Sequence, residues 1–303
     1  MVGELNTFAK LRAFVKLTRP IFLLGGALLH GLGIVIAASQ GVPIHVGRLL
    51  LGQWLVTAIQ LTAHYSNEYY DVEVDRLVTR QRTLFSGGSG VLASGELSPQ
   101  TALIAARLCA LNALVIIAIT LTVEPVVGVI GIVALLGSWF YSWPPLSLMG
   151  SGWGELTTSL IVALLTPLTG FILQASRFDP GIVVVCLPLV LIHWAMMITF
   201  EFPDFEADRA LGKKTLAVRL GRERAAWLHN ALLIFAFALI TGLALHWQAA
   251  RFVWLALPLG VWQFAGVLWR ARRGWSRLQL LTSSAVALLA LTTVLWMMGF
   301  VIG

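Results

Sequence analysis

The chain is poor in charged residues. Asp, Glu, Lys and Arg make up only 12% of its 303 residues, whereas soluble domains carry about 25%. Hydrophobic residues reach 58%, so the composition excludes an ordinary soluble domain. The short alternating strands of a membrane barrel are absent as well. The expected class is an all-α, polytopic membrane protein.

Cysteine is also scarce. The two cysteines, Cys109 and Cys186, both lie inside apolar segments. Neither a disulfide framework nor a catalytic thiol is expected, and both are interpreted as buried thiols. The formal charge of +7 does not indicate a nucleic-acid partner, because the basic residues concentrate in short connections between apolar segments.

Nine apolar segments are long enough to cross a bilayer. A hydrocarbon core about 30 Å thick needs roughly 17 to 25 apolar residues, and in lipid their backbone groups have to be bonded within a helix. The expected spans are residues 20–39, 47–66, 99–122, 125–142, 154–175, 180–200, 225–246, 251–269 and 279–301. The whole chain, residues 1–303, is thus predicted to form a single transmembrane domain.

The basic residues indicate how this domain is oriented. If the N-terminus is cytoplasmic, only Arg48, Arg177 and Arg251 fall outside, and the other 18 of the 21 Lys and Arg residues fall inside. Residues before Ile21 are polar and basic and belong to this cytoplasmic set. The positive-inside rule therefore predicts a cytoplasmic N-terminus.

Two acidic stretches interrupt this apolar background. They are N-E-Y-Y-D-V-E-V-D at residues 67–75 and E-F-P-D-F-E-A-D at residues 201–208. In a helix, residues four apart share a face. The residues brought onto one face in this way are Asn67, Asp71 and Asp75 in the first stretch, and Asp204 and Asp208 in the second, with Glu201 one turn earlier.

Both stretches end even-numbered spans and therefore lie on the same, cytoplasmic side. Carboxylates and amides are the hard oxygen ligands that Mg²⁺ takes, commonly together with substrate phosphates. The two facing stretches predict a site for Mg²⁺ and a diphosphate, which is a leaving group.

The alternative is that the acids are helix-end charges paired with bases such as Arg76, Arg80 and Lys213. Eight of the 14 acidic residues fall in the two stretches, and a charge at the centre of a membrane helix costs about 2.5 to 3.5 kcal/mol. This concentration favours a site. The alternative is kept for the acids off the shared faces, Glu68, Glu73 and Glu206.

The same order of span, acidic stretch, basic loop and span occurs twice. It predicts an internal duplication of residues 20–142 and 154–269, with the ninth helix, 279–301, as an addition. The first loop contains four glycines within residues 85–99. These suit either a lid that approaches a phosphate closely or a flexible connector.

Aromatic and imidazole groups are further candidates for the site. His64 lies one turn before Asn67 and is expected either to touch the substrate or to be bonded within the bundle. Tyr141 begins the uncharged connection Y-S-W-P-P-L-S-L. Trp139 and Trp143 beside it are expected to line a cavity for a hydrophobic tail or a carbocation.

These residues resemble the UbiA superfamily of intramembrane aromatic prenyltransferases over nearly the whole chain. The segment from Asn67 to Asp75 is similar to the family's N-x-x-x-D-x-x-x-D, and Asp204-x3-Asp208 is similar to its second D-x-x-x-D. The tail D-R-A-L-G-K-K-T-L-A-V-R-L-G, residues 208–221, is also of the family's type.

The resemblance implies a nine-helix bundle around a central cavity with cytoplasmic lid loops, in which Mg²⁺ ions bridge an isoprenoid diphosphate. It implies metal ligation by Asn67, Asp71, Asp75, Asp204 and Asp208. Of these, Asp71, Asp204 and Asp208 are implied to be catalytic. The implied substrate contacts are Asn67, Arg82, Lys213, Lys214, Tyr141 and His64.

The acceptor is predicted from the tail of the second motif. G-K-K-T-L-A-V-R-L-G resembles the menaquinone branch, which prenylates 1,4-dihydroxy-2-naphthoate in a prokaryotic inner or plasma membrane. No lysine follows Tyr141, which is a departure from many members. The open alternatives are 4-hydroxybenzoate, heme, chlorophyllide and a glycerol phosphate lipid. An ion-coupled transporter is the alternative of another class, but its acids are expected at the midplane.

Overall fold

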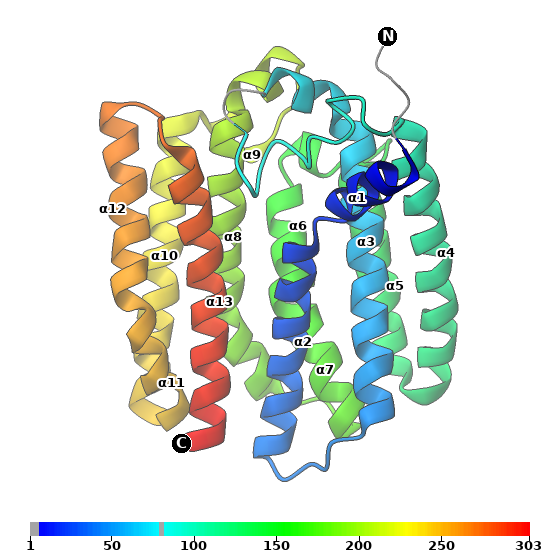
Figure 1. Cartoon of the computed structure of the whole chain (residues 1–303). Coiled ribbons are helices and arrows are strands. Elements are labelled where there is room, and N and C mark those ends of the chain that lie inside the picture. The colour runs from blue at the N-terminus through cyan, green and yellow to red at the C-terminus, as the bar shows by residue number, and fades with distance from the viewer. Residues whose placement is uncertain (1–5, 79–81) are drawn as a thin grey trace.

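The computed structural model describes residues 6–78 and 82–303, and its regular elements in these ranges are all helices (Figure 1). The uninterrupted long helices are α2 (Pro20–Ser39), α3 (Val46–Leu77), α4 (Pro99–Val123), α5 (Pro125–Ser142), α8 (Pro180–Ala210), α10 (Arg222–His246) and α13 (Leu278–Ile302). Of the bases named above as pairing partners, Arg80 lies outside the described residues.

Two further spans are composite. In the first, α6 (Gly154–Leu160) continues through a π-helical turn, Ile161–Leu165, into α7 (Thr166–Ala175). In the second, α11 (Gln248–Val253) continues through a 3₁₀ turn into α12 (Leu257–Arg273).

Proline explains why the observed helix starts agree closely with the expected ones. Pro20, Pro99, Pro125 and Pro180 each occupy the first residue of a long helix. Proline has no backbone N–H group, and the N–H groups of a helix's first turn have no partner within the helix, so nothing is lost there. Its fixed φ also suits a helix. The side chain of Asp179 also caps α8 by accepting a hydrogen bond from a backbone N–H two residues on.

Eight helical segments within the described ranges are long and apolar enough to cross a membrane. The expected second span corresponds to α3, which has 32 residues but also carries polar side chains such as Gln53, Gln60 and His64. Each of the nine expected spans therefore corresponds to a helical segment, while nine membrane crossings stay a prediction. Both α3 and α8 continue about ten residues beyond the expected span and include the acidic stretches.

The helices form a bundle with an inner and an outer set. Helices α2, α3, α5, α6, α7, α8 and α13 contribute residues to a central cavity. Outside them, α4 packs on α3 and α5, and α10 and α12 complete the other flank (Figure 1).

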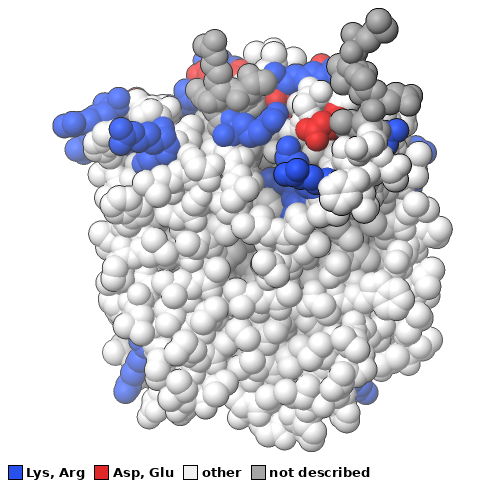
Figure 2. All heavy atoms as spheres, viewed as in Figure 1, with Lys and Arg blue, Asp and Glu red and all other residues white. Residues whose placement is uncertain are grey.

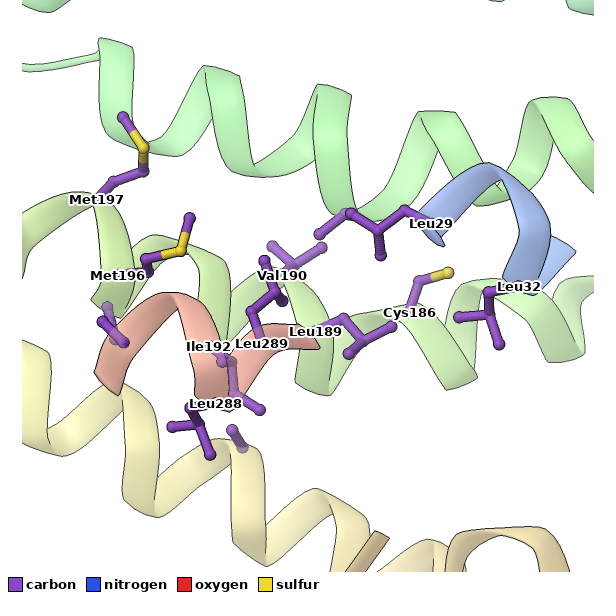
Figure 3. Close-up of a cluster of buried hydrophobic side chains, with 14 of the residues drawn as sticks. Leu29, Leu32, Cys186, Leu189, Val190, Ile192, Met196, Met197, Leu288 and Leu289 are labelled. Carbon is purple, nitrogen blue, oxygen red and sulfur yellow. The ribbon is translucent and has the colours of Figure 1, made fainter. Parts of the chain in front are cut away.

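Figure 3 shows Leu29 of α2, Leu189 of α8 and Leu288 of α13 within one buried apolar cluster, together with the thiol of Cys186. The predicted burial of Cys186 is confirmed, and Cys109 is partly exposed.

Charged side chains gather at one end of the bundle, and most of the face in Figure 2 is uncharged. Both acidic stretches lie at that end, in the last turns of α3 and α8. A helix that we did not predict, α1 (Thr7–Leu17), lies across the same end (Figure 1). It packs Ala13 and Leu17 against the bundle and carries the basic residues Lys10, Arg12 and Lys16.

Candidate active site

A cavity of about 270 Å³ lies inside the bundle and reaches the charged end. Most of its wall is apolar, with side chains such as Leu29, Leu55, Ile59, Leu165 and Met196. Its acidic end is formed by Asn67, Asp71, Asp75 and Asp204. The cavity therefore joins a group of hard oxygen donors to a long hydrophobic space.

The first acidic stretch has the predicted geometry. Asn67, Asp71 and Asp75 all border the cavity from successive turns of α3. Asn67 Nδ2 donates to Asp71 Oδ2 at 2.7 Å. The Asp75 side chain is buried. The four-residue spacing thus brings one amide and two carboxylates together.

The second stretch divides its residues between two environments. Asp204 borders the cavity and accepts a hydrogen bond from the Gly87 N–H at 3.2 Å through Oδ2. Its Oδ1 is buried and has no hydrogen-bond partner among the described residues. Asp208 is also buried but lies behind the cavity wall, beside Lys213. Asp204 therefore presents a free ligand oxygen at the cavity, whereas Asp208 lies beside the ammonium of Lys213.

Lys213 connects the two acidic stretches. Its Nζ hydrogen-bonds to Asp71 Oδ1 and lies 3.7 Å from Asp208 Oδ1. Burial by itself lowers the pKa of this ammonium, but the neighbouring Asp71 and Asp208 carboxylates outweigh burial and raise that pKa above its ordinary value. Lys213 thus stays charged at physiological pH. The neighbouring Lys214 is exposed, and its side chain has no ion pair within the described ranges.

The glycine-containing loop is a folded lid. Gly88 has a φ of 64°, and a Cβ added there would overlap the carboxylate of Asp75. Arg82 donates from Nε to Gly87 O at 2.8 Å and from Nη2 to Asp75 O at 2.9 Å. The guanidinium of Arg82 therefore holds the lid, and Arg82 does not itself border the cavity.

Glu68 corrects one prediction. We expected a helix-end charge paired with a base such as Arg76, and Glu68 indeed lies 4.0 Å from a base, Arg19, and outside the cavity wall. Its side chain is nevertheless 1% exposed and accepts hydrogen bonds from Ser89 N and Oγ at 2.6 and 2.7 Å. The prediction was wrong about the position at an open helix end, because the lid covers this face of α3. Glu73 and Glu206 pair with neighbouring arginines, as expected of helix-end charges.

Only some of the aromatic and imidazole residues predicted for the site border the cavity. Tyr141 borders the cavity and donates from its hydroxyl to Met149 Sδ at 3.1 Å. His64 also borders the cavity, with Nδ1 3.1 Å from Thr18 O. Trp139 and Trp143 stack on each other instead, with ring centroids 4.4 Å apart, and neither borders the cavity. Their sequence proximity to Tyr141 was misleading, because successive helix residues point in different directions.

Comparison with known proteins decides the family. The sequence profile of the UbiA prenyltransferase family matches residues 27–280. The chain belongs to the UbiA prenyltransferase family. It is an integral membrane protein and a prenyltransferase, not the ion-coupled transporter considered above.

Relatives of this UbiA protein carry different names. A 1,4-dihydroxy-2-naphthoate octaprenyltransferase of Bacillus subtilis is 25% identical over 249 residues, which cover 80% of this chain and 78% of the relative. A digeranylgeranylglyceryl phosphate synthase of Thermococcus gammatolerans is 29% identical over 226 residues, 72% of this chain and 73% of the relative. The fold is similar to that of a UbiA homolog from Archaeoglobus fulgidus bound to DMAPP and Mg²⁺, with a TM-score of 0.66, 18% identity and coverage of 96% and 99% of the two chains.

The acidic end of this UbiA cavity fits a hard cation. Carboxylates and an amide surround it, and the unpaired Oδ1 of Asp204 is an oxygen that a cation would satisfy. No group of three His, Cys, Asp or Glu side chains already converges on one point within residues 6–78 and 82–303. The ammonium of Lys213 lies instead between Asp71 and Asp208. The donor set is nevertheless of the chemical kind that Mg²⁺ takes.

Sequence reasoning missed Arg19 and Glu155 of this UbiA site and misplaced Glu201. Arg19, between α1 and α2, borders the cavity and donates from Nη2 to Phe85 O of the lid at 2.9 Å. Glu155 and Glu201 are buried and accept hydrogen bonds from Leu216 N and Ala217 N, at 3.0 and 2.6 Å. They fix the start of α9 (Leu216–Leu220) and, with it, the loop that carries Lys213. Glu201 thus turns towards α9 and away from the face shared by the aspartates.

Arg19 and Glu155 each have a signal in the sequence that could have been used. Arg19 directly precedes the proline that begins the first span, on the side of the acidic stretches. Glu155 is an acid within the first turn of an otherwise apolar span, where a buried charge is costly unless it has partners. The partners themselves come from distant parts of the chain and have no local signature.

Proposed function

We propose that this prenyltransferase transfers a polyprenyl group from an isoprenoid diphosphate to an aromatic acceptor, 1,4-dihydroxy-2-naphthoate, in a reaction that depends on Mg²⁺. The observation that carries the proposal is the union of oxygen donors and an apolar cavity in one space. The named Bacillus subtilis relative supports the choice of acceptor, as does the tail of the second motif, residues 208–221.

The residues that would hold Mg²⁺ are Asn67, Asp71, Asp75, Asp204 and Asp208. Bound Mg²⁺ would neutralise negative charge on the departing diphosphate. The predicted roles of Asp71, Asp204 and Asp208 in catalysis follow from this binding. The similarity of the fold to the Archaeoglobus fulgidus UbiA homolog bound to DMAPP and Mg²⁺ is consistent with Mg²⁺ binding here.

Other groups of the chain would bind and shield the substrate. Lys213 and Arg19 place positive charge next to the acidic end and would bind diphosphate oxygens. The bond from the first prenyl carbon to the diphosphate breaks, and its electron pair leaves with the diphosphate. The apolar wall would exclude water from that carbon until a ring carbon of the acceptor bonds to it. The attacking ring carbon is the one that bears the carboxylate, so the bond to that carboxylate breaks, carbon dioxide leaves, and the electron pair of the broken bond restores the aromatic ring.

The proposal includes the orientation and the duplication. A cytoplasmic site is supported by the gathering of basic residues at the acidic end of the bundle (Figure 2), which the positive-inside rule assigns to the cytoplasm. We also propose that the chain is one domain of two related halves, residues 20–142 and 154–269, followed by a ninth helix. The matching positions of the acidic stretches at the ends of α3 and α8 support this division.

A glycerol phosphate lipid is the second candidate acceptor, because the Thermococcus relative is 29% identical. The two are separated by incubating purified protein with Mg²⁺, a labelled polyprenyl diphosphate and each acceptor in turn, including 4-hydroxybenzoate, heme and chlorophyllide. We expect a prenylated naphthalene product. A product formed only with another acceptor would contradict the proposed substrate and leave prenyl transfer intact.

A further inference from the structure

Helix α1 has an apolar face that the bundle does not cover. Phe8, Leu11 and Val15 follow one another at spacings of three and four residues and share one side of the helix. Their exposed fractions are 77%, 60% and 51%. The opposite side packs Ala13 and Leu17 on the bundle. Three large apolar side chains are unfavourable in water, so this face needs an apolar covering.

The depth of α1 places its apolar face at the boundary of the expected membrane region. The buried side of α1 forms one apolar cluster with Tyr65 of α3 and Ala102 of α4. Phe14 also stacks on the Tyr65 ring, with ring centroids 5.7 Å apart. Tyr65 lies at the end of the expected span 47–66, and Ala102 lies near the start of the expected span 99–122. Helix α1 is therefore level with the ends of two spans and does not stand above them in solvent.

The turn after α1 determines the direction of the helix. Arg19 has a φ of 51°, in the left-handed region, and α2 begins at the next residue, Pro20. This conformation is uncommon for a residue with a side chain. It interrupts the two helices, so that α1 lies across the end of the bundle and does not extend α2 (Figure 1). A helix that lies across a membrane bundle runs along the bilayer surface.

The charges of α1 are of one sign. The helix carries Lys10, Arg12 and Lys16, all exposed, and no acidic residue. Lys16 Nζ lies 3.9 Å from Glu96 Oε1 of the lid, whereas Lys10 and Arg12 have no ion pair within residues 6–78 and 82–303. Helices with one apolar face and basic flanks lie in the bilayer interface, where anionic headgroups attract the basic side chains. The charge of α1 is therefore complementary to an anionic lipid surface.

We propose that α1 is an interfacial helix that binds anionic phospholipid. Phe8, Leu11 and Val15 lie among the acyl chains, and Lys10 and Arg12 bind headgroup phosphates. None of the described residues of α1 borders the cavity, so this surface is separate from the proposed site of prenyl transfer. Lipid binding by α1 is therefore independent of the acceptor that the enzyme uses.

The test places a fluorescent label on the apolar face of α1 in the full chain. Leu11→Cys is labelled with bimane in a Cys109→Ala background, because Cys109 is partly exposed, while Cys186 is buried and can stay. The protein is reconstituted in nanodiscs of phosphatidylcholine and phosphatidylglycerol in equal parts. A nitroxide quencher is attached to the acyl chain of one lipid or of the other. The ratio of the two quenching constants gives the preference of α1 for anionic lipid.

We expect phosphatidylglycerol to be preferred about 5-fold, the attraction of one basic side chain near an anionic surface. Lys10→Gln/Arg12→Gln should bring the two quenching constants to within about twofold of each other. The matched control is Arg272→Gln/Arg273→Gln, which removes the same charge from exposed positions at the end of α12. This control should keep the wild-type preference. Raised ionic strength should reduce the preference, because salt screens exposed charges.

Three results would overturn the assignment. Quenching of the label by aqueous iodide and not by acyl-chain nitroxide would show that the face is outside the lipid, as for a face that binds a protein partner or a second copy of the chain. Equal quenching by the two lipids in the protein with native charges, or equal loss of preference in the two double variants, would show that α1 does not select anionic headgroups. If Lys10→Gln/Arg12→Gln cannot be reconstituted, a wild-type preference that salt leaves unchanged contradicts the proposal instead.

Discussion

Replacing Lys213 with Met removes the ammonium that links the two acidic stretches and keeps most of the apolar stem. The side chains of Lys213 and Asp71 are only 21% and 20% exposed, and that of Asp208 is 4% exposed. The substitution therefore leaves two carboxylates close together with little solvent. Removing one partner of a buried ion pair costs about 3 to 5 kcal/mol, and the partial exposure here reduces the expected cost to about 2 to 3 kcal/mol.

The assay is thermal unfolding of the purified protein in detergent, first in chelator and then in Mg²⁺. In chelator, the Lys213→Met variant should unfold about 4 to 12 °C below wild type, because 1 kcal/mol corresponds to about 2 to 4 °C for a chain of a few hundred residues. Lys214→Met is the matched control, since Lys214 is exposed and should change Tm by less than about 1 °C. Mg²⁺ should restore most of the Tm that Lys213→Met loses, because the charge of the ion replaces that of the ammonium.

Two results would refute this reasoning. If Lys213→Met and wild type unfold at the same temperature in chelator, the ion pairs contribute nothing to the stability of the metal-free protein. If Mg²⁺ stabilises neither protein, the acidic residues next to Lys213 are not a metal site.

The remaining predictions concern the acidic end and the lid. Asp71→Asn and Asp204→Asn should each lower turnover at least about 100-fold, the usual loss of one electrostatic contributor. Tm in chelator should stay within about 2 °C of wild type for Asp204→Asn, whereas Asp71→Asn also removes the ion pair with Lys213 and should lower Tm. Near-normal turnover in either variant would remove that residue from the proposed metal ligands. Chelation should stop prenyl transfer and added Mg²⁺ should restore it, measured as labelled product; activity in chelator would contradict metal dependence. Gly88→Ala should lower both Tm and turnover because its Cβ overlaps the Asp75 carboxylate, whereas Gly95→Ala, at a similar positive φ with open space around it, should cost only about 1 kcal/mol of backbone strain. Equal effects of the two glycine substitutions would show that the lid contact is unimportant.

The parts of the structure that depend on neighbours in sequence could be predicted. Apolar runs and the initial prolines determined the helices, since a membrane span is bonded within itself. The four-residue spacing likewise brought Asn67, Asp71 and Asp75 to one face, because helix geometry is fixed. The duplication stays a prediction, as it concerns similarity between the halves and not the position of any side chain.

The parts that depend on distant contacts could not be predicted. Glu68 was interpreted as a helix-end charge because its neighbours in sequence do not show that residues 82–97 fold over it. Lys213 and Lys214 are adjacent and chemically identical in sequence, yet one faces the acidic residues and the other faces solvent. Their difference arises from the start of α9, which Glu155 and Glu201 fix. Such assignments need the three-dimensional arrangement.

The central claim is that the two acidic stretches hold Mg²⁺ and a diphosphate together. It is tested most directly by calorimetric binding of a non-hydrolysable polyprenyl diphosphate analogue to wild type and Asp204→Asn, with and without Mg²⁺. Wild type should bind the analogue tightly only with Mg²⁺, and Asp204→Asn should lose most of that increment. Equal binding of the analogue by wild type in Mg²⁺ and in chelator would contradict the account.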